Sequence, residues 1–270
     1  MMSKFIVKPS TIDDIDILIN KDIYGIIYPI KDLSIYSSFY LDIDYIKNIK
    51  TNKKKIILLN KIMHNKDLDL LDSVLSKIDD SIDYIIFYDM AVYELSKKYN
   101  LIDRLVIAKD HLNRSTLSNN FYKSLGINNT YITSDITIDD IKEIKKYTNI
   151  SIFYTIYGNI PIFCSKRKLL SNYFKYIDKP NTKNMYTLEN SNKTYTIREE
   201  NNTIIYSDLV NLINEIDNIN DIDYLVIDLN INNNIEVLDK FINKDKDGKD
   251  YYLGFYNTKT IFKVKKWKVD

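Results

Sequence analysis

The chain has very little cysteine, and this scarcity excludes several kinds of site. Its 270 residues include one cysteine, Cys164, so no disulfide can form within one chain and no metal centre can be built from cysteines alone. Glycine (5 residues) and proline (4 residues) are scarce too. No glycine-rich loop follows any apolar run, which argues against a dinucleotide-binding fold.

A strong charge of either sign is also missing. The 38 basic and 37 acidic side chains leave a formal net charge of +1, so a contact with RNA would need a local basic patch rather than an overall excess. No run approaches the length of a membrane span, and MMSKFIVKPS lacks the apolar core of a signal peptide. We therefore expect a cytoplasmic protein with no membrane contact.

What the chain does contain is a large apolar fraction. Hydrophobic residues make up 45% of the sequence, as in a globular protein with a sizeable core. Isoleucine, lysine, asparagine and the 23 tyrosines are abundant, as codon bias in an AT-rich bacterial genome would produce. The composition therefore predicts a folded domain but no particular chemistry.

Short apolar runs rich in β-branched residues recur along the chain. Most are separated by segments whose apolar residues lie three and four positions apart, such as Leu68, Leu71 and Leu75. Continuous apolar runs of this kind are typical of buried parallel strands. The eight predicted strands are Lys4–Val7, Tyr24–Tyr28, Lys55–Leu59, Tyr84–Tyr88, Leu105–Ala108, Thr130–Thr133, Ile152–Ile156 and Tyr224–Leu229.

Eight strand–helix units predict an α/β chain that forms a TIM-like (β/α)8 barrel with a parallel eight-stranded sheet. Thr11, Ser115, Thr137 and Ser207 are predicted to cap the starts of helices. A length of 270 residues fits one barrel domain over residues 1–270.

One segment interrupts this alternation. Residues 175–206 combine polar turns with period-two patterning, as at Tyr195 and Ile197, which predicts a β-hairpin inserted between the seventh and eighth units. Residues 249–270 are predicted to form an extended C-terminal tail.

The stretch from Tyr157 to Phe174, YGNIPIFCSKRKLLSNYF, resembles the signature segment of the collagenase-like peptidase family U32. Members carry a His-Gly or Tyr-Gly turn, then Ser-x-Arg, then Leu-Leu-Ser/Gly-Asn-Tyr. The branch that it resembles most contains tRNA uridine hydroxylation proteins. The matching residues are Tyr157, Gly158, Ser165, Arg167, Leu169, Leu170, Asn172 and Tyr173.

Other segments extend the resemblance over most of the chain. LLNKIMHNKDLDLL resembles a family block that contains Asn60 and His64, and IDYIIFYDMAVYEL resembles the segment in which Asp89 ends the fourth strand. The chain departs from the family at the fifth strand, where Ala108, Lys109 and Asp110 replace Ser-Thr-Gln. It departs again at the sixth strand, where the family arginine is lost beside Asp135.

The resemblance also concerns the cofactor. Hydroxylating relatives are thought to use an iron–sulfur cluster, which needs about four thiolates. Where those relatives place two of their cysteines, this chain has Pro161 and Lys168. We therefore expect no iron–sulfur cluster and no other cofactor.

Three functions stay open. The first is a cluster-free role in tRNA wobble-uridine hydroxylation, with RNA or a small organic acid as ligand and a cluster-bearing paralogue as partner. The second is a hydrolase or peptidase, as the family label implies, although no Gly-x-Ser-x-Gly or His-Glu-x-x-His motif is present. The third is a non-catalytic binding or partner subunit.

Functional groups of such barrels lie where strands end. The substrate-binding candidates are Asn60, His64, Asp89, Asp135, Tyr157, Ser165 and Arg167, and Lys109, Asp110, His111, Ser134 and Asp228 are expected at the same mouth.

Each candidate also has a structural alternative. His64 could cap a helix, and Arg167 could anchor the hairpin through Glu199 or Glu200 instead of binding an anion. Asp89, Asp135 and Asp228 could hold a metal as a carboxylate cluster, or Asp89 and Asp135 could be helix caps. Cys164 is expected to be a buried thiol.

Overall fold

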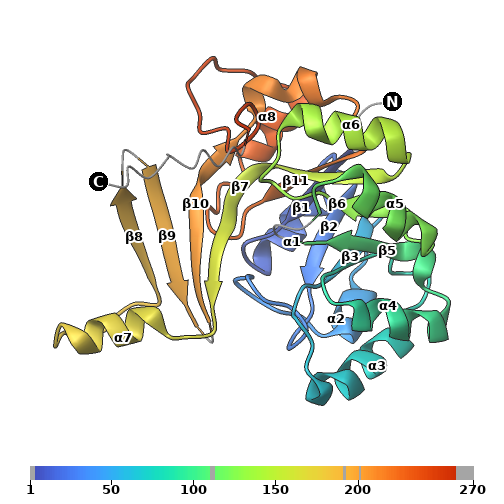
Figure 1. Cartoon of the computed structure of the whole chain (residues 1–270), viewed down its shortest axis with the longest axis horizontal. Helices are drawn as coiled ribbons and strands as arrows, with labels where there is room; N and C mark the ends of the chain where they lie inside the picture. Colours follow the sequence, from blue (N-terminus) through green and yellow to red (C-terminus); the bar gives the residue numbers. More distant parts are fainter. Residues whose placement is uncertain (1–3, 110–112, 191–192, 201, 260–270) are drawn as a thin grey trace, which may run out of the picture.

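Eight parallel strands close into a barrel in the computed structural model, which describes residues 4–109, 113–190, 193–200 and 202–259 (Figure 1). The ring closes because β11 pairs in parallel with both β1 and β7. This confirms the predicted barrel, and each predicted strand overlaps one observed strand. The barrel strands are β1 (Lys4–Lys8), β2 (Gly25–Pro29), β3 (Lys54–Leu59), β4 (Tyr84–Phe87), β5 (Leu105–Ala108), β6 (Asn129–Tyr131), the first half of β7 (Ser151–Ser165) and β11 (Tyr224–Asp228).

Helices follow most of these strands. Ser115 and Thr137 accept hydrogen bonds at the starts of α5 and α6, as predicted, and Thr11 accepts one from the Asp14 amide beside α1. Within the described residues, no helix is long and apolar enough to cross a membrane. The helices are α1 (Asp13–Leu18), α2 (Ile43–Asn48), α3 (Leu68–Ser76), α4 (Met90–Ser96), α5 (Thr116–Ser124), α6 (Ile138–Thr148) and α8 (Val237–Asn243), with short 3-10 turns η1 (Asn65–Asp67), η2 (Lys97–Tyr99), η3 (Ile102–Arg104) and η4 (Ile213–Ile219).

The strands bury both of their faces, which explains their continuous apolar sequences. In β3, Ile56 and Leu58 face the inside of the barrel, whereas Ile57 and Leu59 pack in the layer under the helices. The inside is filled at one end by aromatic rings, with Phe153 and Tyr224 separated by 4.3 Å between centroids. The barrel interior is therefore a packed core and not a channel.

A second antiparallel layer, here called the arm (residues 158–211), projects from the barrel (Figure 1). Strand β7 continues beyond the barrel and pairs with β10 (Thr203–Asn211), which pairs with β9 (Lys193–Glu199), which pairs with β8 (Met185–Asn190). Helix α7 (Leu169–Tyr176) connects β7 to β8.

The arm contains the predicted hairpin and corrects two other sequence predictions. The predicted hairpin over 175–206 corresponds to β8 and β9, but β10 and the outer half of β7 belong to the same sheet. The seventh strand does not end at Ile156, and Ser207 does not begin a helix but lies within β10. Each of these segments continues as a strand because β7 and β10 pair with one another outside the barrel.

Strand β7 leaves the barrel at a specific backbone feature. Gly158 has a φ of +138°, and a Cβ at this position would lie 2.7 Å from the Asp228 carbonyl oxygen. A side chain would therefore be strained in conformation and would collide with β11. The Tyr-Gly pair of the signature segment thus marks the point where the arm begins.

Candidate functional site

A cavity of about 90 Å³ with polar and apolar lining residues lies at the carboxyl end of the barrel. Since one water needs roughly 10–15 Å³ by this type of measure, the cavity has room for a small polar group. Polar side chains that line it include Lys8, Asn60, Lys109, Thr133, Asn159 and Asp228. We call it the mouth cavity.

The charges at the mouth cavity are paired. The Lys8 ammonium lies 3.2 Å from Asp228 Oδ2 and donates to the Tyr36 carbonyl at 2.9 Å, while Asp228 Oδ1 accepts from the Asn230 amide. The Lys109 ammonium donates to the Tyr88 carbonyl. Lys8 ends the first strand, so the strand-end rule could have found it in the sequence.

Two asparagines face the same cavity with different partners. Asn60 is buried, and its side chain accepts from the Ile35 amide and donates to the Ile35 carbonyl, so it fixes the loop after β2. Asn159 donates to the Ser207 carbonyl at 3.0 Å, but its buried Oδ1 has no hydrogen-bond partner among the described residues. Asn159, which sequence reasoning missed, directly follows Gly158 and lines the mouth cavity.

The predicted carboxylate cluster does not form. Asp89 accepts from the Ala91 amide at the start of α4 and from the Met63 amide. Asp135 accepts from Thr133 and pairs with Arg114 at 3.0 Å, while Asp228 pairs with Lys8. No three His, Cys, Asp or Glu side chains of the described ranges lie together as metal ligands would. Of the two interpretations of these carboxylates, the cluster is therefore the one that the described residues do not form, because each carboxylate already has its own partners.

Tyr157 does not reach the mouth. A register shift beside it, where Val226 pairs with Thr155 and Ile227 with Tyr157, turns its side chain outward. The ring is 2% exposed and packs against Phe241, with a centroid distance of 6.1 Å. Burial raises the pKa of the Tyr157 hydroxyl. Thr155 and Tyr131, which share a hydrogen bond of 2.8 Å, line the mouth cavity instead.

A larger cleft of about 490 Å³ separates the barrel rim from the arm. We call it the rim cleft. Lys31, Lys61 and His64 line it from the barrel, and Cys164, Lys166 and Arg198 line it from the arm. The lining contains four cationic side chains, Lys31, Lys61, Lys166 and Arg198. It contains two acidic side chains, Asp32 and Glu200.

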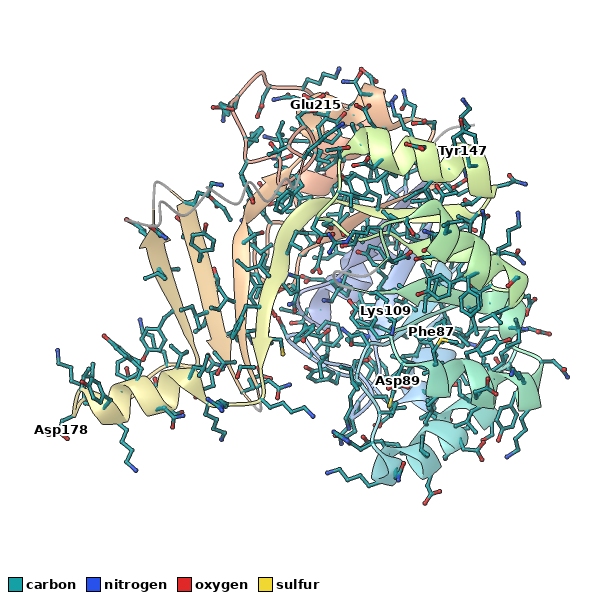
Figure 2. The ribbon with its side chains drawn as sticks, in the orientation of Figure 1. Phe87, Asp89, Lys109, Tyr147, Asp178 and Glu215 are labelled. Carbon is teal, nitrogen blue, oxygen red and sulfur yellow. The ribbon has the colours of Figure 1, made fainter. Side chains whose placement is uncertain are left out.

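Two bridges span the rim cleft. His64 Nε2 lies 3.1 Å from the Lys166 ammonium, and the Arg198 guanidinium donates to the Ser37 carbonyl at 3.2 Å. Figure 2 shows Asp89 and Lys109 on the barrel and Asp178 at the far end of the arm. His64 therefore lies at an interface between two parts of the molecule that are distant in sequence.

The remaining candidates lie on the arm. Ser165 Oγ accepts from the Arg167 amide at 3.1 Å, and the Arg167 side chain is exposed outside the linings of both cavities. Cys164 is exposed, so the expectation of a buried thiol is wrong; the outer half of β7 has solvent on one face. Asp110 and His111 lie outside the described residues.

Glu199 is not the partner of Arg167. Its buried carboxylate accepts from the Leu170 and Ser171 amides and from Thr203, so it caps the start of α7. Burial raises the pKa of Glu199, but the hydrogen bonds from Ser171, Thr203 and the two amides outweigh it and hold that pKa below its ordinary value.

An iron–sulfur cluster does not fit this donor set. Such a cluster needs about four thiolates, and the chain has only the exposed Cys164. Pro161 lines the mouth cavity, and the exposed Lys168 precedes α7. Neither side chain can replace a thiolate.

The fold and the site define a (β/α)8 barrel with a small mouth cavity and an antiparallel arm inserted before the last strand. The profile of peptidase family U32 matches residues 43–234, which include the arm. The chain therefore belongs to peptidase family U32.

Individual relatives are distant. The chain is 26% identical over 168 residues to tRNA hydroxylation protein P2 of Bacillus subtilis (strain 168), a match that covers 58% of this chain and 54% of that protein. The match thus spans about half the length of the curated relative.

Two solved structures give the following similarities. The U32 peptidase Mk0906 has a TM-score of 0.46 at 12% identity, with 59% of this chain and 70% of that chain covered. Orotidine 5'-monophosphate decarboxylase of Methanocaldococcus jannaschii has a TM-score of 0.51 at 13% identity, with 92% and 100% covered.

Proposed function

We propose that this protein binds tRNA and serves the hydroxylation of a wobble uridine, without an iron–sulfur cluster of its own. The observation that carries the proposal is the rim cleft, where four cationic side chains from the barrel and the arm surround one space. Two of them have acidic partners, Lys61 with Asp67 and Arg198 with Glu200, so Lys31 and Lys166 are the cations we assign to phosphate. Family membership and the relative named for tRNA hydroxylation supply the chemical context.

The charge distribution supports RNA as the ligand. The arm contains 8 Lys and Arg against 5 Asp and Glu, a net charge of +3, whereas the rest of the chain contains 30 against 32, a net charge of −2. Glu199 is used internally as the cap of α7, so the outward face of the arm is more basic still. Phosphates are attracted to such local patches even when the overall charge is close to zero.

Aromatic side chains on the arm add a second kind of contact. Tyr173 and Tyr176 on α7 are 57% and 88% exposed. Exposed rings beside basic side chains are typical of surfaces on which unpaired bases stack.

The mouth cavity fits the edge of one base better than a longer ligand. Uracil presents one N–H donor between two carbonyl acceptors, and Asn159 Oδ1 is a buried acceptor without a partner among the described residues. A uridine turned out of its stack would place this N–H toward Asn159. Oxidation of the base needs a redox centre that this donor set cannot hold, so we assign that step to a cluster-bearing paralogue as partner.

RNA binding can be tested by charge reversal at the edge of the rim cleft. The double variant Lys31→Glu/Lys166→Glu, which reverses two lysines of the cleft lining, should weaken tRNA binding and lower the slope of log K against log salt by about 2, one for each phosphate that is no longer neutralised. Lys50→Glu/Lys53→Glu, which changes the charge equally just before β3, is the matched control and should leave the slope unchanged. Equal effects of the two pairs would contradict a binding site in the cleft.

The role in modification has a separate test. Mass spectrometry of tRNA from a deletion strain should show loss or reduction of the hydroxylated wobble uridine, and the wild-type gene should restore it. Unchanged modification in the deletion strain would remove the proposal.

The hydrolase alternative has less support. Cys164 and His64 line the same cleft, but the imidazole lies against Lys166, and no hydrogen bond joins it to the thiol of Cys164. A cysteine nucleophile needs a base within hydrogen-bond reach.

A further inference from the structure

We propose that Tyr36, where the rim cleft meets the mouth cavity, stacks on the uridine that enters the cavity and so holds the base in place. Tyr36 lies in the loop after β2, and among the residues that the structure describes it alone lines both spaces. This inference rests on the proposed tRNA binding, to which it adds the residue that connects the phosphate site with the base site.

The two spaces have to adjoin if one nucleotide is to occupy both. A single sugar joins the phosphate of a nucleotide to its base, so a base turned out of its stack stays close to its own backbone. Lys31 and Lys166, which we assign to phosphate, line the rim cleft, and Asn159 lines the mouth cavity. The two linings meet at Tyr36, so a nucleotide that spans them contacts this residue.

The backbone of Tyr36 has a conformation that a bulky side chain rarely adopts. Its φ is +63°, in the left-handed region where glycine or asparagine is far more common. Conformations of this kind persist only where the surrounding structure fixes them, and they are concentrated at ligand-binding and active sites. A tyrosine in this position therefore indicates that its aromatic ring has a role of its own.

Four parts of the molecule hold this loop in place. The Tyr36 carbonyl accepts from the Lys8 ammonium and from the Asn230 side-chain amide, both at 2.9 Å. Asn60 binds the backbone of the preceding residue, and Arg198 of the arm donates to the carbonyl of the following one. The position of Tyr36 is thus fixed from β1, from the ends of β3 and β11, and from the arm.

The side chain of Tyr36 is fixed as well. It is 9% exposed and belongs to an apolar cluster with Ile204 and Tyr206 of β10. An aromatic ring that is already held by packing loses little conformational freedom when a base stacks on it. Every base has a face that can stack, so Tyr36 would hold the base while Asn159 reads its edge.

The test compares two RNAs that differ only at the wobble position. One is an anticodon stem-loop with uridine there, and the other is the same stem-loop with an abasic site. Fluorescence anisotropy at constant salt should show that the wild-type protein binds the uridine RNA about fivefold to a hundredfold more tightly, the range expected for one stacked base. Tyr36→Phe keeps the ring and should retain this preference.

Two variants remove the ring in different ways. Tyr36→Gly accepts the positive φ without strain, and Tyr36→Leu keeps an apolar side chain against Ile204 and Tyr206 but has no aromatic face. Both should bind the two RNAs equally. Their affinity for the abasic RNA should stay within about twofold of wild type, because the phosphate contacts are unchanged. If glycine at this position disturbs the fold and weakens binding of the abasic RNA, the leucine variant decides between stacking and packing.

The outcomes separate this inference from the proposed function. A wild-type protein that binds neither RNA would overturn tRNA binding, and this inference with it. Equal binding of the two RNAs by the wild-type protein would overturn base entry and the role of Tyr36, but not the phosphate site in the rim cleft. A full preference for uridine in Tyr36→Leu would overturn the role of Tyr36 alone.

Discussion

Two phenylalanines on the same strand show how the barrel differs from the arm. Phe153 lies in the barrel half of β7 and is 0% exposed, with Tyr84, Tyr131 and Tyr224 around it. Phe163 lies ten residues later, in the arm half, and is 45% exposed. The strand is continuous, but its environment changes at Gly158.

The difference in burial indicates different roles for the barrel and the arm. In the barrel, apolar side chains fill two layers and hold the strands in a closed ring. In the arm, apolar and basic side chains such as Phe163 and Lys166 are exposed. The barrel should therefore determine the free energy of unfolding, and the arm should determine what the protein binds.

The largest expected effect is a loss of stability when a side chain is removed from the barrel core. Phe153→Ala should lower the free energy of unfolding by about 3–5 kcal/mol, because it leaves a cavity among packed rings. Phe163→Ala is the matched control and should change it by no more than about 0.5 kcal/mol. Urea denaturation of both variants measures the difference, and similar losses would contradict the contrast drawn from β7.

The next effect should stay within the arm. Glu199→Ala leaves the amides at the start of α7 without their acceptor and should cost about 1–3 kcal/mol of local stability. Hydrogen exchange should become faster in α7 while the barrel strands stay protected. Glu200→Ala, which removes the neighbouring exposed carboxylate, should have little effect. Loss of protection throughout the barrel would show that the arm is not a separate unit.

The same carboxylate predicts a pH dependence. Since the pKa of Glu199 is lower in the folded state than in the unfolded chain, its stabilising contribution is present above the unfolded value of about 4.3 and is lost as the pH falls. Glu199→Gln should remove this part of the acid sensitivity of α7.

A smaller effect concerns the tyrosines that close one end of the barrel. The Tyr84 hydroxyl lies 3.0 Å from that of Tyr224 and 3.4 Å from that of Tyr24, so Tyr84→Phe should cost about 1 kcal/mol. Burial, followed by the hydrogen bond with Tyr224, raises the pKa of Tyr84 to about 12. This contribution is present below the unfolded pKa of about 10 and is lost as the pH rises through 12. A Tyr84→Phe variant with wild-type stability across this range would contradict the role of the hydroxyl.

The smallest expected effect is at the single cysteine. Cys164→Ser should change the free energy of unfolding by less than about 0.5 kcal/mol, because the thiol is exposed, and should leave wobble-uridine modification intact. Loss of modification in a strain that carries this variant would reopen the thiol chemistry of the hydrolase alternative.

The strand pattern was readable because each barrel strand buries both faces. In runs such as Lys55–Leu59 the side chains on both faces of the strand are apolar. They can be buried only in a sheet that is covered on its outside, which predicts the parallel barrel. The signature segment was harder to interpret, because Pro161 and the polar residues after it resemble a loop. Pairing of β7 with β10 makes it a strand, and β10 lies about 40 residues later in the chain.

The candidate site was predicted only in part. Asn60, Ser134 and Asp228 do line the mouth cavity, as their positions at strand ends indicated. Tyr157 was misplaced because a one-residue register shift reverses the face of a strand, and Asp89 became a helix cap. The rim cleft could not be predicted, because its two sides come from segments about 100 residues apart.

The sequence by itself determined the barrel, the family signature and the shortage of thiolates, because these depend on local patterns and on counts of residues. The tertiary structure alone decided which polar groups share a cavity, that Glu199 supports α7, and that side chains of the barrel and the arm line one cleft. These features depend on the pairing of distant strands and on the direction in which each side chain points.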